Sequence, residues 1–281
     1  MDDKIVAIYT IVSDFLMAIH HYEDPQRQMS DAEVMTTAIV AALFFAGNYE
    51  SARSLLAEPW YFPAMLSKSR FNRRLHRVKA KFLSLFSLLG EHWKDLNTDS
   101  LYAIDTFPVA ACDNYRIKRC HLYQGEAYRG FIASKKRYFY GLKIHLIVTK
   151  DGQPVKFLLT PGADSDVECL DLFDFDLPPG SEVYADRIYV NYILEDVFNE
   201  AGILFKPLRK KNLTRQWQPW ERYWISLHRK MIETTGSLIE RILPKSIHAV
   251  TSVGFELKVR LFILAMSFGH VFKVATYRET I

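Results

Sequence analysis

The sequence is poor in cysteine and lacks the patterns that announce several common classes of protein. Its three cysteines, Cys112, Cys120 and Cys169, are odd in number and widely spaced, and no two form a Cys-x-x-Cys pair. A disulfide framework and a structural zinc site are therefore not expected. No Gly-x-x-x-x-Gly-Lys segment occurs, so we expect no use of ATP. The longest apolar run, Leu261–Phe268, is shorter than the ~20 residues that span a bilayer.

The chain also lacks a secretion signal, a flexible linker and a large net charge. The acidic start, Met1-Asp-Asp-Lys4, is not typical of a signal peptide, and we expect a soluble protein of the cytoplasm. No stretch rich in Pro, Gly or Ser divides the 281 residues, so the boundary near residue 97 is soft. The net charge of +4 does not by itself predict a nucleic-acid partner. The basic residues nevertheless cluster at 68–81, 116–119, 129–143 and 206–215.

Residues 1–97 have the periodicity of helices. Apolar residues recur every three or four positions in the first segment, which predicts one apolar face. That face consists of Ile5, Ile8, Val12, Phe15 and Ile19. Ser30 and Glu33 have the spacing of a capping box, which predicts the start of a second helix.

A basic helix is predicted from Ser67 to Leu89. Its inward positions are Phe71, Leu75, Val78, Phe82 and Leu85, and its outward positions are Arg70, Arg73, Arg74, Arg77 and Lys81. Few acids accompany these charges, so we expect the outward face to contact DNA phosphates. The alternative is a solvated helix surface.

Beyond residue 97 the pattern changes to strands alternating with helices. A short strand at 101–104 is predicted to end at Asp105. Further strands are predicted at 138–149, 155–160, 182–185 and 203–208, with helices at about 166–173, 190–201, 219–242 and 255–275. This order favours a mixed α/β sheet covered by helices.

Three acids fall where such a fold is able to hold metal ions. Asp105 and Asp186 each follow a predicted strand, and Glu233 lies in a predicted helix that also carries Arg229. Mg²⁺ prefers carboxylate oxygens, and two such ions assist phosphoryl transfer on DNA. Each acid also has a simpler interpretation: Asp105 as a turn residue, Asp186 as a helix cap, and Glu233 as one half of a surface ion pair.

Local motifs favour the catalytic interpretation. In chain order they are Ile104-Asp-Thr-Phe-Pro-Val109 with Cys112 and Arg116, Ala133-Ser-Lys-Lys136, Tyr140-Gly-Leu-Lys-Ile-His145, Leu159-Thr-Pro-Gly162, Asp186-Arg-Ile-Tyr189 and Arg229-Lys-Met-Ile-Glu233-Thr234. Together with Ser69-Arg-Phe-Asn-Arg-Arg-Leu75, this ordered set resembles bacterial insertion-sequence transposases of the Asp-Asp-Glu type, in particular the insertion-sequence family numbered nine-eighty-two.

The resemblance implies a helical DNA-binding region over residues 1–97 and a ribonuclease-H-like catalytic domain over 98–281. It also implies that Asp105, Asp186 and Glu233 hold two Mg²⁺ or Mn²⁺ ions. The expected partners are the terminal repeats of a mobile element, target DNA and a second copy of the chain in the synaptic complex. We expect such a protein in the bacterial cytoplasm, associated with the nucleoid.

The sequence departs from the family pattern at several places. Ala185, Arg187 and Ile188 surround the second acid, where relatives carry Gly before it and Lys-Gly or Lys-Ala after it. Ser226 and Glu240 replace a Tyr and a Lys around the third acid, and Glu240 is a rival ligand. Two other functions stay open: a catalytically inactive DNA-binding descendant, and a metal-dependent nuclease that does not join strands.

Other residues have competing interpretations. Further DNA contacts are expected from Lys135, Lys136, Lys143, Arg187, Lys210, Lys211 and Arg229. Lys143 and His145 share a strand face and either touch phosphate or lie in solvent. Asp166 is predicted to cap the following helix. The basic run 206–215, followed by Trp217 and Trp220, either grips a DNA end and stacks a displaced base, or is a solvated loop with core tryptophans.

Overall fold

The structure is a computed structural model that describes residues 1–228, 243, 244 and 246–278. Of the residues singled out above, Arg229, Glu233 and Glu240 lie outside the described residues. The chain divides into two compact units. The first takes in Met1–Leu88, residues 239–247 and the C-terminal segment from Val253. The second takes in residues 89–238 and His248–Ser252.

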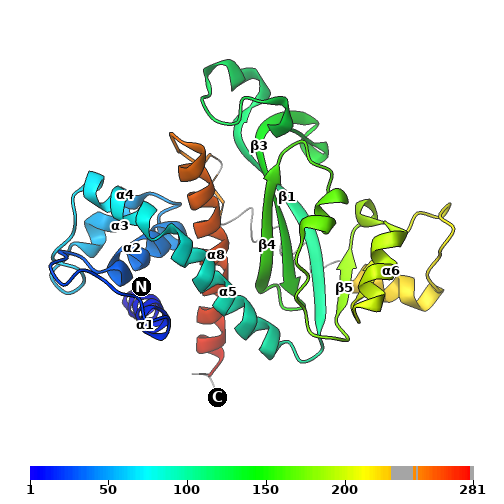
Figure 1. The fold of residues 1–281 in the computed structure, drawn as a ribbon, viewed down its shortest axis with the longest axis horizontal. Helices are drawn as coiled ribbons and strands as arrows, with labels where there is room; N and C mark the ends of the chain where they lie inside the picture. The colour runs from blue at the N-terminus through cyan, green and yellow to red at the C-terminus, as the bar shows by residue number, and fades with distance from the viewer. Residues whose placement is uncertain (229–242, 245, 279–281) are drawn as a thin grey trace. The chain divides into compact units, whose positions relative to one another are not determined.

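The first unit is helical (Figure 1). Its elements are α1 (Asp2–Ala18), α2 (Asp31–Phe44), α3 (Tyr49–Leu56), α4 (Lys68–Arg77), the start of α5 (Lys79–Leu96), and α8 (Ser252–Arg278). α2 packs against α1, α3 and α4 and is buried along most of its length. Among the described residues no single helix is long and apolar enough to cross a membrane; α2 and α3 meet that condition only as a pair bent by 118°.

The expected helix signals at the start of the chain are largely confirmed. Ile5, Ile8, Val12 and Phe15 are buried, and they form the apolar face of α1. Ile19 differs: it is 42% exposed, because the helix ends one residue before it. The capping box is present, since the Glu33 amide donates to Ser30 Oγ at 3.1 Å and the Ser30 amide donates to Glu33 Oε2 at 2.6 Å.

The sequence predicted one helix for the basic segment, but the structure has two. α4 ends with Val78 as its C-terminal cap, and α5 begins at the next residue. The inward side chains are nevertheless those expected, because all five are buried: Phe71, Leu75, Val78, Phe82 and Leu85. The apolar pattern therefore identified the buried face without revealing the break.

A six-stranded mixed sheet forms the second unit (Figure 1). Its strands are β1 (Leu101–Asp113), β2 (Arg129–Ile132), β3 (Arg137–Thr149), β4 (Pro154–Pro161), β5 (Glu182–Ala185) and β6 (Leu204–Pro207). The order is β2-β3-β1-β5-β6, with β4 also pairing β3. β3 is antiparallel to β1, β2 and β4, whereas β1, β5 and β6 are parallel. The expected mixed α/β sheet flanked by helices is confirmed.

β1 is longer than predicted. It continues nine positions past Ile104 to Asp113, so Asp105 lies within the strand and not at its end. The pairing of β1 with β5 ends at Ile104, and beyond that point β1 pairs with β3 alone. Pro108 lies in this part of β1, where the strand is paired on one side only. Proline is tolerated there because its missing amide hydrogen is not needed for hydrogen bonds to a second neighbouring strand.

Close approach of β1 and β3 explains one glycine of the Tyr140–His145 motif. A side-chain carbon at Gly141 would lie 2.2 Å from the carbonyl oxygen of Val109, so only glycine fits. The pairing register shifts beside this point, between Ala110 and Cys112. The long antiparallel pairing of β1 with β3 therefore depends on this residue.

Short 3-10 turns and one helix connect the strands. The turns are η1 (Asn114–Arg119), η2 (Glu126–Tyr128), η3 (Ala133–Lys135), η4 (Glu168–Leu172) and η5 (Arg187–Tyr189). The helix α6 (Tyr192–Glu200) joins β5 to β6, and Asn191 caps it. The helix predicted at 166–173 is thus the shorter turn η4, and Asp166 does not cap it, because Val167 occupies the cap position.

Candidate active site

Asp105 and Asp186 each follow the last paired residue of one parallel ladder. Ile104 of β1 pairs with Ala185 of β5, and the next residue on each chain is an acid. Neighbouring strands lie ~4.8 Å apart, and side chains alternate between the two faces of a sheet. The two carboxylates therefore belong to the same face and the same edge, although they are far apart in the sequence.

Local hydrogen bonds orient both carboxylates. The Thr106 amide donates to Asp105 Oδ1 at 2.7 Å, and the Arg187 amide donates to Asp186 Oδ1 at 2.7 Å. Asp186 is thereby the N-terminal cap of η5, which was its simpler interpretation. Both acids are partly exposed. Carboxylate oxygens on fixed backbone are the ligands that Mg²⁺ prefers, so this pair fits a divalent metal ion.

The segment that leads to Glu233 packs on the same face of the sheet. Glu233 itself and Arg229 lie outside the described residues, but residues 219–228 are helical. Ile225 is buried against Tyr184 of β5, and His228 stacks on the same ring with centroids 4.6 Å apart. Tyr184 is two residues before Asp186 and faces the same side.

A chain of buried hydrogen bonds lies on the opposite face of β1. The hydroxyl of Thr106 contacts the hydroxyl of Tyr189 and lies 2.9 Å from His145 Nδ1. His145 Nε2 lies 2.9 Å from Thr160 Oγ1. Burial lowers the pKa of His145 to about 4, so the imidazole is neutral at physiological pH. With only 1% of its surface exposed, His145 neither touches phosphate nor lies in solvent, contrary to both interpretations of its strand face.

Lys143 is held by the loop after β4. Its ammonium donates to the Asp164 carbonyl oxygen at 2.7 Å and to Asp166 Oδ1 at 2.9 Å. Asp166 therefore serves as a counter-ion for Lys143, in place of the helix cap that was predicted. Strand alternation places Lys143 on the same face as His145, opposite to Asp105.

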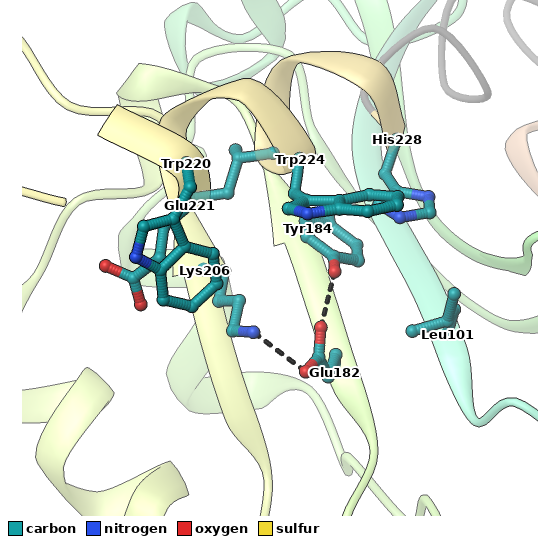
Figure 2. A pocket seen from close by; sticks show the side chains of 9 residues that line it. Leu101, Glu182, Tyr184, Lys206, Trp220, Glu221, Trp224 and His228 are labelled. Atoms are coloured by element: carbon teal, nitrogen blue, oxygen red, sulfur yellow. Dashed lines mark hydrogen bonds and ion pairs between the residues drawn. The ribbon is translucent and has the colours of Figure 1, made fainter. Parts of the chain in front are cut away.

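A pocket of about 260 Å³ lies over β5 and β6, beneath the helical residues 220–228 (Figure 2). Glu182 lies at its floor, where it accepts hydrogen bonds from the Tyr184 hydroxyl and, at 2.8 Å, from Lys206 Nζ. Burial acts to raise the pKa of Glu182, but the hydrogen bonds from Lys206 and Tyr184 outweigh it, and the pKa lies below its usual value. Trp220 and Trp224 form the wall above the floor, and they are 64% and 48% exposed.

The basic loop after β6 is pinned to α6 at both ends. Arg209 pairs with Glu195 at 2.5 Å, with 4% of each side chain exposed, and Arg215 pairs with Asp196 at 2.6 Å. Trp217 covers Arg209 with 4.5 Å from the guanidinium carbon to the ring centroid, and its indole N–H donates to the Pro207 carbonyl oxygen. Between the two anchors Lys210 and Lys211 are exposed.

The structure agrees in part with the solvated-loop interpretation of this segment, and DNA contact stays a prediction. Trp217 belongs to the packed base of the loop, as the solvated-loop alternative expected. Trp220 and the two lysines face solvent, as DNA contact requires. Glu182, Tyr184 and Trp224 were not singled out from the sequence. The alternation of side chains on β5 and the helical spacing after Trp220 were the signals that could have identified them.

The basic residues of α4 fall into two groups. Arg70, Arg73 and Arg77 are exposed and form no ion pair within the described part of the chain. Arg74 differs from the outward position expected for it, because its guanidinium contacts Asp31 of α2, with Nε 3.1 Å from Oδ1. Lys81, at the start of α5, is partly buried.

Arg74 also belongs to a cluster that resembles a metal site. His21, Glu23 and Asp31 offer ligand atoms within 4.8 Å of one another. His21 Nε2 lies 2.8 Å from Asp31 Oδ2, and Arg27 Nε lies 2.8 Å from Glu23 Oε2. With Arg74 also in contact, the side-chain cations already balance both carboxylates, so the cluster ties α4 to α2 and has little capacity for a metal ion.

Other predicted DNA contacts occupy turns. Lys135 and Lys136 are exposed between β2 and β3, and Lys136 has a left-handed backbone with φ of 47°. Arg187 is exposed directly after Asp186. These cations lie in the second unit, together with Lys210 and Lys211.

Comparison with known proteins gives two findings. The family model described as "Transposase DDE domain" matches residues 96–248, which is more than half of the chain. A piggyBac transposase solved by cryo-electron microscopy as a synaptic complex with hairpin DNA is similar in structure, with 7% sequence identity and a TM-score of 0.49. That match covers 98% of this chain and 74% of the other. No curated protein sequence matches the chain.

Proposed function

Because the chain belongs to the transposase DDE domain family, we propose that it cleaves DNA at the ends of an insertion sequence and joins the freed 3′-hydroxyl to target DNA. The observation that carries this proposal is the placement of Asp105 and Asp186 directly after paired positions of two parallel strands. Membership of the family numbered nine-eighty-two rests on the motifs alone.

We further propose that Asp105, Asp186 and Glu233 hold two divalent ions, Mg²⁺ or Mn²⁺. Bound there, the ions would activate the attacking water or 3′-hydroxyl and stabilise the leaving oxygen. The two aspartates supply oxygen ligands on backbone that the amides of Thr106 and Arg187 hold in place. The protein's part is to keep these ligands fixed before DNA arrives.

Glu233 has the reach that this role needs. His228, five residues earlier, stacks over Tyr184, which is two residues before Asp186. Five extended residues span at most ~18 Å, and two strand residues span ~7 Å. The distance along the chain therefore supports Glu233 as the third ligand, with Glu240 as its rival.

The sheet order supports a ribonuclease-H-like domain. An antiparallel meander of β1, β3 and β4 is followed by β5 and β6, which join β1 on its other side in parallel. The first acid then lies on the first strand and the second acid after the first parallel neighbour of that strand.

DNA is the proposed partner of both units. The exposed side chains of Arg70, Arg73 and Arg77 in the first unit, and of Lys210 and Lys211 in the second, are suited to phosphate contact. We propose that Trp220 and Trp224 stack a base of the DNA end, since the pocket beside them is smaller than the ~300 Å³ of typical larger ligand sites. A homodimer that pairs two element ends is part of the same proposal.

The test is metal-dependent cleavage of a labelled duplex that carries the DNA end flanking the coding sequence. The native chain should cleave in Mg²⁺ or Mn²⁺, and Asp105→Asn, Asp186→Asn and Glu233→Gln should lose cleavage while they still bind the duplex. Asp174→Asn is the matched control, because Asp174 is an 86% exposed acid of the same unit that pairs only with Lys156 among described residues. Retained cleavage in the Asp105 variant would refute the assignment.

Two further outcomes separate the alternatives. Products that join pre-cleaved ends to a target plasmid would distinguish the transposase from a nuclease that never joins strands. Salt-sensitive binding without any cleavage by the native chain would identify the inactive descendant, which the unusual Ala185, Arg187 and Ile188 keep open.

A further inference from the structure

Tyr189 is attached to the segments of both catalytic-site aspartates. Its amide donates to the Asp186 carbonyl oxygen at 3.1 Å, which closes the η5 turn. Its hydroxyl contacts the hydroxyl of Thr106, the residue directly after Asp105. Because the Tyr189 side chain has no exposed surface, this link between β1 and η5 is shielded from competing water.

The link extends to two more strands of the sheet. Thr106 of β1 lies opposite His145 of β3, and their side chains are 2.9 Å apart. His145 in turn contacts Thr160 of β4. Four segments, β1, β3, β4 and η5, are therefore joined by one line of hydroxyl and imidazole groups, which is buried except at the partly exposed Thr106.

One arrangement of protons satisfies every group along this line. Tyr189 O–H donates to Thr106 Oγ1, whose hydroxyl donates to the unprotonated Nδ1 of His145. His145 Nε2–H then donates to Thr160 Oγ1, whose hydroxyl points toward the Pro161 carbonyl oxygen at 3.5 Å. This arrangement needs a neutral imidazole, which agrees with the low pKa of His145. A buried polar line that is fully satisfied is rigid, because each lost bond leaves an unpaired group.

We propose that Tyr189, Thr106 and His145 are positioning residues that set the separation of the Asp105 and Asp186 carboxylates for a divalent cation. The proposal rests on the proposed function, since it assumes that these two carboxylates bind the ion. None of the three side chains touches the ion. They act on the backbone that carries the carboxylates: Thr106 through its amide to Asp105 Oδ1, and Tyr189 through its amide to the Asp186 carbonyl oxygen.

The experiment measures Mn²⁺ binding to the full chain by calorimetry or electron paramagnetic resonance, together with the thermal midpoint of unfolding. Tyr189→Phe and Thr106→Val each remove one hydroxyl and should weaken Mn²⁺ binding about 10-fold, the lower end of the loss seen when outer groups around a metal site are removed. Thr106→Ser keeps the hydroxyl and should retain native affinity. Tyr140→Phe is the matched control. Tyr140 lies on β3, as His145 does, and the substitution removes a hydroxyl that donates to Glu126.

The outcomes distinguish the positioning role from the proposed metal site on which it depends. If Asp105→Asn binds Mn²⁺ as tightly as the native chain, the proposed metal site is wrong, and the positioning role is overturned with it. If Asp105→Asn loses binding but Tyr189→Phe and Thr106→Val keep native affinity, the metal site stands and the positioning role alone is overturned. A purely structural role would give Thr106→Val and Tyr140→Phe the same result: a lower unfolding midpoint with unchanged Mn²⁺ affinity.

Discussion

Two groups of carboxylates in this chain appear equally suited to metal ions but differ in what holds them. In the first unit, Arg27 pairs with Glu23 and Arg74 pairs with Asp31 at ion-pair distances, and His21 Nε2 also contacts Asp31. In the second, Asp105 and Asp186 accept the amides of the residues that follow them. Arginine partners neutralise a carboxylate and fix it in the packing of the helices, whereas an amide donor orients a carboxylate oxygen without neutralising its charge. Proximity of acids alone does not identify a metal site.

The sharpest test of this contrast replaces one acid from each group. Asp186→Asn should lower metal-dependent cleavage about 1,000-fold, since a bound ion contributes several kcal/mol to stabilising the transition state, and should leave stability nearly unchanged. Asp31→Asn should do the reverse. It removes a charged partner of Arg74 and should lower the free energy of unfolding by about 2 kcal/mol, with unchanged Mn²⁺ affinity. Cleavage assays and urea unfolding measure the two effects, and equal loss of activity in both variants would contradict the contrast.

Acid should destabilise the second unit through His145. Burial lowers its pKa to about 4 in the folded chain, against about 6.5 when unfolded. The folded state therefore binds fewer protons between these values, and its stability is full above pH ~6.5 and falls as the pH is lowered toward 4. The expected loss is about 3 kcal/mol. Urea unfolding at pH 7 and 4.5 should show a smaller loss for His145→Gln than for the native chain, and identical losses would refute this.

The same contrast applies to two neighbouring cations of α4, Arg73 and Arg74. Arg74→Ala should lower the free energy of unfolding by about 1–2 kcal/mol, because Asp31 loses its charged partner. Arg73→Ala should change stability by less than about 0.5 kcal/mol but reduce the slope of log affinity against log salt by about 1. Filter binding of the element end across a salt series measures the slope. A larger slope change for Arg74→Ala than for Arg73→Ala would argue against the assignment.

The smallest effect is expected at the aromatic wall of the pocket. Trp220→Ala should weaken binding of the DNA end by about 1 kcal/mol, roughly fivefold, if its ring stacks a base. Because Trp220 is 64% exposed, stability should be nearly unchanged. Trp217→Phe is the comparison: it loses a hydrogen bond to Pro207 and should lower stability without a specific effect on DNA affinity. Native affinity in Trp220→Ala would remove the pocket from the DNA interface.

Local patterns in the sequence were sufficient for much of the fold. Alternation and turn residues located five of the six strands but missed β2, and periodicity identified the buried face of α4 and α5. The strands predicted before Asp105 and Asp186 do pair in parallel, and Ile104 pairs with Ala185, so each acid directly follows a paired residue; their role as metal ligands stays a prediction. These features depend on residues close in the chain, which is why one sequence sufficed.

Features that depend on distant partners were not predictable. No glycine or proline marks the break at Val78, so the helix appeared continuous. In the sequence Arg74 resembles Arg70, Arg73 and Arg77, and only the fold brings Asp31 of α2 next to it. His145 looked like half of an exposed pair because nothing in β3 reveals that β1 and β4 provide hydroxyls for both of its nitrogens. For Arg74 and His145 the deciding contact comes from another element of the fold.

The most direct test of the central claim is to locate the ion. Crystals grown or soaked in Mn²⁺ should show an anomalous diffraction peak between the carboxylates of Asp105 and Asp186. A peak at His21, Glu23 and Asp31 with none at the paired strands, or no peak at either place, would contradict the account.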